Sequence, residues 1–571
     1  MDDGNFDVII IGTGLTESIT AAALSKAGFK VAHIDENSYY GGNEASLSLD
    51  EVVQWADGMA SSPYPKYTSV SRSVQIPSQT RQYSICLSPS IIPSSGPIIS
   101  SLVSSGVAKY GAFRLLERVG VYKSGIIQSV PGSKEDVFKG KDISLIDKRR
   151  LMRFLKFAAG DFENEKEYEH ADKMSFSGFL SDVFCLKDDL HSALVFALAF
   201  CFAPTEPAVP VLYRIRRYLR SIGKYGPSPF LIGHYGGTGE IAQGFCRASA
   251  VSGGVYILGR HITSITHSNE HAISEDFKSA YHYSITLDDF PDTLTSRVII
   301  SSASHVPRHL SHLTKYLENS NSSASSFSVA RGIAILNRGV IFPPTNTSAP
   351  DGEEDEDSTT SLDQPTLAPL DAGVIVFPPF SVTGGSANTA ATVLVTGEGT
   401  MSTPSGKWII YITLPLLTPP SESTSAEEIL RPYLDATLAL TTEPSSSIVS
   451  FSSNSATPSP PEAVPPQPLF TTFYIEHPDS LSAPDNSSAQ HRTYIVPAPL
   501  VPAYPLPDLP DAAATSAEGV FWETVRILRE AGVRPNQASN EEHGLEVDEE
   551  IGTFWPPMQG DEVSEGEDSM D

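Results

Sequence analysis

The apolar and polar positions of residues 7–43 predict a strand, a turn, a helix and a second strand. Residues 8–11 form a continuous apolar run, which is typical of a strand buried on both faces. Gly12 and Gly14 follow within three residues, and a helical pattern then continues to Gly28. A second apolar run ends at Asp35. This order predicts the strand–turn–helix–strand unit that binds dinucleotides in many proteins.

One residue of this unit is unsuited to holding a nucleotide. A dinucleotide fingerprint has a third glycine three positions after the second, where the helix amides face a pyrophosphate. Glu17 occupies that position. A carboxylate there meets the positive end of the helix dipole and repels a phosphate. The sequence therefore predicts a closed nucleotide site without cofactor, in which Gly12, Gly14, Glu17 and Asp35 remain as a vestigial motif.

The hydrophobic pattern becomes helical in the middle of the chain. From residue 144 to residue 223 apolar pairs recur at helical spacing, as at residues 151–152, 154–155 and 157–158. We expect residues 126–224 to form an inserted all-helical domain. The longest apolar run, residues 193–203, has 11 residues, whereas a helix needs ~20 to span a bilayer. The sequence therefore predicts no membrane span.

Strand patterns return after Pro229 and continue to residue 475. Strands are predicted at residues 254–258, 262–266, 283–287, 297–301, 330–336, 373–377, 408–414 and 473–475. With the opening unit they predict an α/β fold of the dinucleotide-binding kind. Its sheet domain is discontinuous and comprises residues 1–125 and 225–535.

Several segments are rich in Ser, Thr, Pro or acidic residues. Residues 319–328, 345–366, 381–389 and 442–467 cannot bury enough apolar area to offset the entropy of ordering, so we expect disorder there. The acidic tail, residues 536–571, is expected to be disordered too. Within it, Phe554 and Trp555 are either a small docking anchor or an aromatic pair in a disordered tail.

The net charge and the cysteines narrow the range of possible partners and cellular compartments. The chain of 571 residues carries 39 Lys and Arg against 68 Asp and Glu, a net charge of −29. This balance disfavours nucleic acid or an anionic membrane surface as the main partner. The four cysteines, residues 86, 185, 201 and 246, form no C-x-x-C pair, and the N-terminus has no signal-peptide pattern. We expect a cytoplasmic protein with reduced thiols and no bound metal.

Four stretches resemble the superfamily of Rab GDP-dissociation inhibitors and Rab escort proteins. They are IGTGLTESI with HID and YYGGN at residues 11–43, SGVAKYGAF at 105–113, VPGSKEDVFKGKDISLIDKRRLMRFLKF at 130–157, and YGPSPFLIGHYGGTGEIAQGFCRASAVSGGVYIL at 225–258. The resemblance implies a flavoprotein-like fold that has lost its flavin. YYGGN, PGSKEDVF, the added length and the acidic inserts are more similar to the escort branch than to the compact inhibitors.

The resemblance also implies a function. A member of the escort branch is not catalytic: it binds newly made Rab GTPases in the GDP form and presents them to Rab geranylgeranyltransferase. It then escorts the prenylated Rab to membranes, so the implied partners are Rab, the catalytic heterodimer and the geranylgeranyl lipid, and membrane contact is transient. The implied Rab-binding platform is Tyr39, Arg81, Glu240, Arg247 and Ile257, with Lys224 in a mobile loop. The alternative for Glu240 is an intrachain role at the start of a helix.

Three further sets of residues follow from the resemblance, each with core packing as its alternative. Val107, Tyr110, Phe113, Leu115 and Val121 are expected to form an apolar groove for the C-terminal tail of Rab. Leu194, Phe196, Leu198 and Phe200 are expected to line the prenyl pocket. Phe176, Phe179 and Leu180 are the weakest assignment, as a docking point for the transferase.

Two other functions stay open. A dissociation inhibitor would bind only prenylated Rab. A flavin-dependent oxidoreductase is supported by Asp35, which stands where a dinucleotide site has its ribose-binding acid. Glu17 and the absence of a late Gly-Asp motif argue against the oxidoreductase. No P-loop, H-E-x-x-H or G-x-S-x-G motif occurs, so no catalytic residue is predicted.

Overall fold

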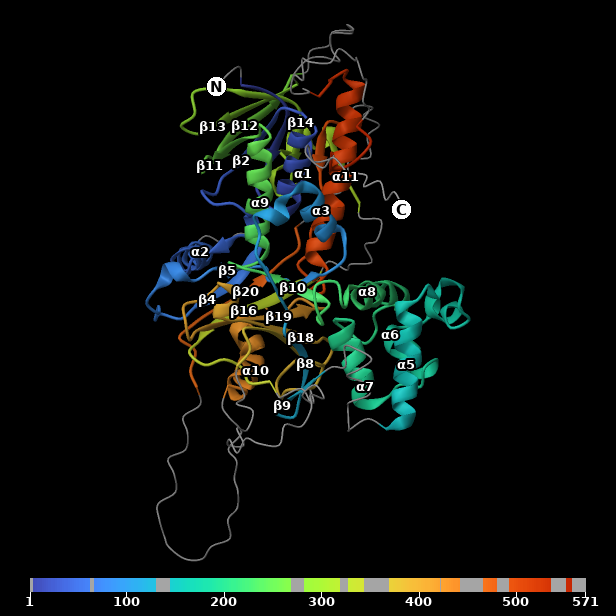
Figure 1. Ribbon diagram of the computed structural model, residues 1–571. Helices are drawn as coiled ribbons and strands as arrows, with labels where there is room; N and C mark the ends of the chain where they lie inside the picture. The colour runs from blue at the N-terminus through green and yellow to red at the C-terminus, as the bar shows by residue number, and fades with distance from the viewer. Residues whose placement is uncertain are drawn as a thin grey trace, which may run out of the picture.

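The computed structural model describes residues 4–61, 66–129, 144–268, 282–318, 327–342, 369–421, 423–441, 466–479, 492–535 and 551–556. Two sheets lie one above the other, and a group of helices lies beside the lower sheet (Figure 1). The predicted insert at 345–366 lies outside the described residues. So do most of 319–328 and 442–467 and all of the tail except residues 551–556.

The upper sheet contains the opening unit. β1 (Asn5–Ile11) lies between β2 (Val31–Asp35) and β14 (Leu294–Ser301), and the order is β11-β2-β1-β14-β13-β12. β1 pairs in parallel with both neighbours. The remaining strands are β11 (Val255–Leu258), β12 (Ile262–His267), β13 (Tyr283–Leu287), β15 (Thr314–Tyr316) and β21 (Tyr494–Val496). The predicted strands of this region are therefore present.

Helices cover one face of the upper sheet. α1 (Leu15–Lys26) packs between α9 (Thr238–Val251) and α11 (Leu509–Glu530), and α3 (Pro97–Ser105) packs on α11. Val8 and Ile10 of β1 pack toward these helices, whereas Ile9 and Ile11 pack on the opposite side with β13 and β21. Both faces of β1 are buried, which explains why its apolar run does not alternate.

The lower sheet is largely antiparallel, in the order β4-β20-β16-β19-β18-β17-β8-β9. Its strands are β4 (Tyr67–Arg72), β8 (Arg118–Lys123), β9 (Ile126–Ser129), β16 (Ser328–Leu336), β17 (Ala372–Phe377), β18 (Ala391–Thr396), β19 (Trp408–Leu416) and β20 (Phe470–Glu476). α10 (Ala426–Ala439) packs on one face against Ala334 and Ile410, whereas Ile333 and Ile409 face the core shared with the helical group.

Further elements connect these strands and helices. They are η1 (Gly42–Glu44), β3 (Ser46–Leu47), α2 (Leu49–Ser61), η2 (Thr80–Gln82), β5 (Ile85–Cys86), β6 (Ile92–Pro93), η3 (Val107–Lys109), β7 (Phe113–Leu115), β10 (Phe230–Gly233), η8 (Ala303–His305), η9 (Arg308–Leu313) and η10 (Glu398–Thr400). None of the helices in the described ranges has the length and apolar character of a membrane span.

The helical group starts later than predicted. Residues 126–129 are β9, which pairs with β8 at the edge of the lower sheet. The helices are α5 (Leu145–Ala159), η4 (Phe162–Asn164), η5 (Tyr168–Lys173), α6 (Phe176–Asp182), α7 (Asp188–Ser192), a π-helical turn (Ala193–Leu198) and α8 (Ala208–Ser221). Its first described helix therefore begins at Leu145, with Ser144 as its N-cap.

Buried ion pairs fasten the helical group to the start of α11. Asp508 accepts hydrogen bonds from Arg217 and from the Tyr218 hydroxyl (2.6 Å), and its other oxygen lies 3.0 Å from Arg214 Nε. Arg217 also pairs with Asp511 at 3.3 Å. Asp511 in turn accepts from the backbone N–H of Ile98 at the first turn of α3 (3.0 Å). Charged groups thus connect α8, α11 and α3.

Two segments predicted to be loops or disordered are ordered. Residues 60–79 are rich in Ser and Pro, which predicts a surface loop, but residues 67–72 form the edge strand β4. The loop at residues 381–389 is held by its own polar groups: the Ser386 N–H donates to the Tyr433 hydroxyl (2.7 Å), and Thr389 Oγ1 donates to the Pro415 carbonyl (2.9 Å). The serines and threonines that indicated disorder supply these bonds.

Candidate functional site

The position of the nucleotide is filled by the chain's own groups. Both the amide and the hydroxyl of Thr13 donate to Asp35 Oδ2 (2.8 and 2.5 Å), and Asn37 donates to Oδ1 from its backbone and its side chain (2.8 and 3.0 Å). The carboxylate expected to bind a ribose is therefore fully engaged. A Cβ on Gly42 would lie 3.3 Å from the Cα of Gly14, so the YYGGN loop packs directly on the glycine turn.

Two carboxyl groups lie beside that turn. A Cβ placed on Gly14 would be 2.7 Å from Glu17 Oε2 and 3.2 Å from Glu44 Oε2. Glu44 Oε2 accepts from the Leu15 N–H (3.2 Å) at the start of α1, where a pyrophosphate oxygen would accept in a dinucleotide site. These groups do not fit a flavin nucleotide, in agreement with the prediction made from Glu17.

Burial governs the charge of these acids. The pKa of Glu17 is raised from 4.5 to about 7, mainly by loss of hydration and to a smaller extent by the neighbouring Glu44 and Asp35. Burial likewise raises the pKa of Glu44. Both pKa shifts favour the protonated form compared with a free carboxylic acid, which is compatible with two carboxyls in one enclosed place. Across the described residues, no three His, Cys, Asp or Glu side chains gather closely enough to hold a metal ion.

Four residues of the predicted platform reach solvent. Glu240 lies in the first turn of α9, Arg247 is exposed two turns later, Arg81 is exposed on η2, and Tyr39 is half-buried after β2. Within the described part of the chain neither Glu240 nor Arg247 makes an ion pair. Glu240 does lie where the helix dipole favours an acid, so its alternative role at the helix start stays open.

The fifth platform residue lies in the core. Ile257 is 7% exposed and packs with Ile34, Ile9 and Ile265 on β11. Side chains alternate between the two faces of a strand, and that of Ile257 points into the core. Ile257 therefore offers almost no surface to a partner in this structure. Lys224 is exposed and donates to Ser95 Oγ (3.3 Å).

The predicted groove is partly assembled beside the platform. The guanidinium of Arg247 lies 4.6 Å from the ring centre of Tyr110, which is 51% exposed. Val107 is buried below them, and Phe113 and Leu115 are partly buried against the same cluster. Val121 does not join them, because it lies on β8 of the lower sheet and is buried there. A cation–π contact thus links the platform to the groove.

The aromatic pair near the C-terminus covers this region. Trp555 stacks on Phe245 of α9, and Phe554 meets Phe521 of α11 edge-on, with ring centres 5.9 and 5.2 Å apart. Both pack against the cluster that contains Val107. Residues 551–556 are therefore docked on the chain itself, in contrast to the disorder expected for the whole tail.

The predicted prenyl-pocket residues are closely packed in the helical group. Leu194, Phe196 and Leu198 lie in the π-helical turn and are buried, as is Phe200, whose backbone has a φ of +51°. A bulky residue in this left-handed region is strained, and π-helical turns occur often at functional sites. A lipid would have to separate side chains that touch in this structure.

The predicted transferase contacts are in the core. Phe176, Phe179 and Leu180 of α6 are fully buried, and Phe179 packs on the rings of Phe157 and Phe184. Core packing, the alternative reading, accounts for them. Exposed apolar side chains of this group lie elsewhere, at Leu145 and Ile146 in the first turn of α5. These two apolar residues lie in a basic, polar stretch of sequence, and the hydrophobic pattern alone does not show that they are exposed.

The protein-family comparison matches residues 1–330 to the model described as GDI, GDP dissociation inhibitor. This stretch is more than half of the chain and includes the closed nucleotide site, α9 and the helical group. The chain belongs to the GDP dissociation inhibitor family.

Similar members of the family carry one name. The Rab proteins geranylgeranyltransferase component A of Saccharomyces cerevisiae is 30% identical over 352 residues, which are 59% of this chain and 55% of that protein. The component A of Candida albicans is 30% identical, with 60% and 54% covered. That of Drosophila melanogaster is 34% identical, with 48% and 57% covered. The chain thus spans about half the length of these relatives.

Solved structures confirm the predicted fold class. A Rab GDI from Plasmodium falciparum superposes with a TM-score of 0.57 at 19% identity, covering 91% of this chain and 98% of that one. An oxidoreductase from Methanosarcina mazei gives 0.50 at 13% identity, covering 90% and 100%. At such identities the likeness concerns the fold alone.

Proposed function

We propose that this chain is a Rab escort protein. It binds newly made Rab GTPases in the GDP form, presents them to the catalytic heterodimer of Rab geranylgeranyltransferase, and escorts the prenylated product to membranes. The observation that carries the proposal is the family match over residues 1–330 together with relatives named component A of that transferase. The chain itself acts as an accessory component without catalytic residues, in the cytoplasm and transiently at membranes.

The surface around α9 supports a role in binding a GTPase. Arg247 and Glu240 offer two opposite charges on one helix, and both can form charge-assisted hydrogen bonds with a partner. Tyr110 adds amphipathic aromatic contact area beside Arg247, and Tyr39 is a half-buried aromatic after β2. The apolar cluster under Tyr110 and Phe113 suits an extended tail with apolar residues. Arg247 and Glu240 lie on α9, which packs on α1 beside the upper sheet and is therefore rigidly supported.

The helical group is the proposed place for the lipid. A geranylgeranyl chain gains ~0.8 kcal/mol for each methylene removed from water, so it needs an apolar enclosure. The strained segment from Leu194 to Phe200 is the part of the buried helical core whose backbone departs most from an α-helix. Opening there would expose Leu194, Phe196 and Leu198 to the lipid.

A reconstituted transfer assay tests the proposal. Unprenylated Rab·GDP is incubated with the catalytic heterodimer and geranylgeranyl diphosphate, with and without this chain, and the transferred lipid is measured. We expect efficient transfer only when the chain is present. Equal transfer in its absence would disprove the escort role.

A dissociation inhibitor is the second candidate, because the matched family model bears that description. An inhibitor binds prenylated Rab and discriminates against the unmodified GTPase. Binding of both forms, measured side by side, separates the two functions. Weak binding of unprenylated Rab with tight binding of prenylated Rab would favour the inhibitor.

Arg247→Ala is expected to weaken Rab·GDP binding about tenfold, or ~1.4 kcal/mol, because an exposed arginine held on an aromatic ring is lost from the interface. Arg526→Ala on α11 is the matched control, since Arg526 is exposed and, among the residues that the structure describes, pairs with Glu523 and Glu530 of its own helix. Binding is measured by titration and folding by thermal melting. A large loss of thermal stability with unchanged binding would contradict the platform assignment.

The purified protein is expected to carry no flavin, because Glu17, Glu44 and the backbone of Gly42 fill the space beside Gly14. The visible absorption spectrum of the native protein and of its heat-denatured supernatant measures this directly. A yellow preparation with a flavin spectrum would show that the nucleotide site is open and would favour the oxidoreductase.

A further inference from the structure

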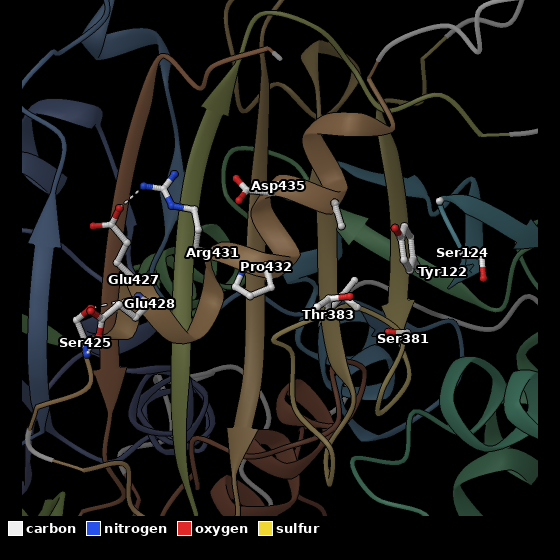
Figure 2. A pocket seen from close by; sticks show the side chains of 13 residues that line it. Tyr122, Ser124, Ser381, Thr383, Ser425, Glu427, Glu428, Arg431, Pro432 and Asp435 are labelled. Carbon is white, nitrogen blue, oxygen red and sulfur yellow. Dashed lines mark hydrogen bonds and ion pairs between the residues drawn. The ribbon is translucent and has the colours of Figure 1, made fainter. Parts of the chain in front are cut away.

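A surface cavity of about 920 Å³ lies at the outer side of the lower sheet, away from α9 and the closed nucleotide site. Three elements form its walls: the β8–β9 hairpin, the loop between β17 and β18, and α10 (Figure 2). The lining residues are Tyr122, Ser124, Gly125, Ser381, Val382, Thr383, Ser425, Glu427, Glu428, Arg431, Pro432, Asp435 and Ala436. None of them belongs to a site predicted for Rab or lipid.

The cavity is electronegative. Glu427, Glu428 and Asp435 contribute three carboxylates against a single cation, Arg431, which is already paired with Glu427. Glu428 also accepts the N–H of Ser425 (2.9 Å) in a capping box. Asp435 is exposed and has no hydrogen bond or ion pair with any other described residue. The cavity therefore offers a free carboxylate and a net negative charge.

The helix backbone adds a further acceptor. Pro432 lies inside α10 and lines the cavity, and it has no N–H to donate to the carbonyl of Glu428. Residues four apart lie on one face of a helix, so this carbonyl is on the cavity side. Ser381 Oγ, also in the lining, is buried without a hydrogen-bond partner. Besides the Asp435 carboxylate, the cavity thus contains a hydroxyl oxygen without a partner and a carbonyl that Pro432 cannot satisfy, which suits a donor-rich cation.

An exposed aromatic residue adjoins the lining of the cavity. Phe380 directly precedes the lining residue Ser381 and is 80% exposed, with a backbone φ of +63°. The loop is fixed in this state: the Phe380 N–H donates to the Ser386 carbonyl (3.0 Å), and the Ser386 N–H donates to the Tyr433 hydroxyl (2.7 Å). A bulky residue at positive φ is strained, and such strain is concentrated at functional sites. An exposed aromatic on an ordered backbone beside a charged cavity can serve as an anchor for a docking protein.

We propose that this cavity is the docking site for an extended, cationic segment of a partner protein. A Lys or Arg side chain of the segment enters the cavity and pairs with Asp435 and Glu428, and a neighbouring apolar side chain packs on Phe380. Charge complementarity identifies the occupant, because the cavity has three carboxylates and a single arginine, which is already paired with Glu427. The described residues contain no cluster of ligands suited to a metal ion. The inference does not depend on the Rab-binding role, which uses other elements.

Binding of defined peptides to the full-length chain tests this proposal. The probe is a fluorescein-labelled, end-capped peptide of alternating Arg and Leu, and the comparison peptide has Glu in place of Arg. Binding is followed by fluorescence anisotropy at ~150 mM salt, where the screening length is ~8 Å, so that distant charges contribute little. We expect saturable binding of the cationic peptide only.

Charge-matched variants locate the site. Asp435→Asn combined with Glu428→Gln removes two charges from the cavity and keeps the capping box, since Gln can replace Glu there. Asp288→Asn combined with Asp289→Asn removes two charges from an exposed turn of the upper sheet. We expect about tenfold weaker binding for the cavity pair and less than about twofold for the control. Equal losses would show unspecific attraction to an acidic protein and would overturn the proposal.

The variant Phe380→Gly separates an effect on peptide binding from an effect on folding. Glycine adopts a φ of +63° without strain, so the melting temperature is expected to stay the same or to rise. Peptide affinity is expected to fall about fivefold or more, because the apolar contact is gone. Unchanged affinity in this variant, or complete displacement of the peptide by spermine, would show that a small cation fills the cavity and would overturn the docking of a protein segment. Rab binding by these variants is expected to be unchanged.

Discussion

Replacing Asp508 with asparagine is expected to lower the free energy of unfolding by ~3–5 kcal/mol. The Asp508 carboxylate neutralises Arg217 and Arg214 and accepts the Tyr218 hydroxyl. These groups are largely buried between the helical group and the sheets, so water cannot replace the lost charge. The asparagine would leave two guanidinium groups with only Glu206 and Asp511 as counter-charges, each at 3.3 Å.

The measurement is chemical unfolding followed by circular dichroism, together with limited proteolysis of the helical group. Asp57→Asn is the control, because Asp57 also pairs with an arginine, Arg72, at 2.8 Å but on the surface. Its expected effect is small, because ion pairs on the surface contribute little to stability. Asp508 precedes α11 without capping it through its side chain, so no cap is lost in the variant. If both variants have the same small effect, the buried pairs do not fasten the helical group.

The sequence predicts the fold where the pattern is local. The run from Val8 to Ile11 and the turn at Gly12 and Gly14 lead to β1, α1 and β2 with nearly the predicted bounds. β4 is missed because YTSVSR is polar: it is an edge strand, and only its pairing with β20 makes it a strand. The loop at 381–389 is missed for a similar reason, since Tyr433 and Pro415, far along the chain, order its hydroxyl groups.

The positions of site residues are harder to predict from the sequence than helices and strands. Arg247 and Glu240 lie at the surface as the family resemblance implies, and Arg247 also meets Tyr110 from the predicted groove. Ile257 and Val121 are apolar residues on strands, and only tertiary packing decides whether such a side chain faces a partner or the core. For Phe554 and Trp555 the sequence leaves two interpretations open, a docking anchor or an aromatic pair in a disordered tail. Their partners on α9 and α11 lie too far away in sequence for a local pattern to reveal the contact.

The closed nucleotide site has a consequence for stability that can be measured by changing pH. Because burial raises the pKa of Glu17 from 4.5 to about 7, the folded chain holds a proton that the unfolded chain releases above pH 4.5. Between these values the unfolded state binds fewer protons, so stability falls as pH rises. The stabilising contribution is complete below pH 4.5 and is lost as the pH passes about 7.

Glu17→Gln is therefore expected to match the wild type in stability near pH 4.5 and to exceed it by ~2 kcal/mol at pH 8. Glutamine keeps the shape of the protonated acid and cannot ionise. The full pKa difference would correspond to a larger value, but Glu17 retains a partly exposed edge where water screens the charge. Denaturant midpoints at both pH values measure the effect. Glu518→Gln, at an exposed position on α11, is the control for the loss of one negative charge.

The comparison of these two variants decides whether the space beside the glycine turn is closed by a carboxyl group or open to a ligand. If Glu17→Gln stabilises the chain at pH 8 and Glu518→Gln does not, a carboxyl in the former phosphate position is enclosed and prefers its proton. A pyrophosphate, which cannot be neutralised by a single proton, would then be excluded from the same place. A pH profile of Glu17→Gln parallel to that of the wild type would instead place a hydrated, charged Glu17 at the start of α1, with room for a ligand beside Gly14.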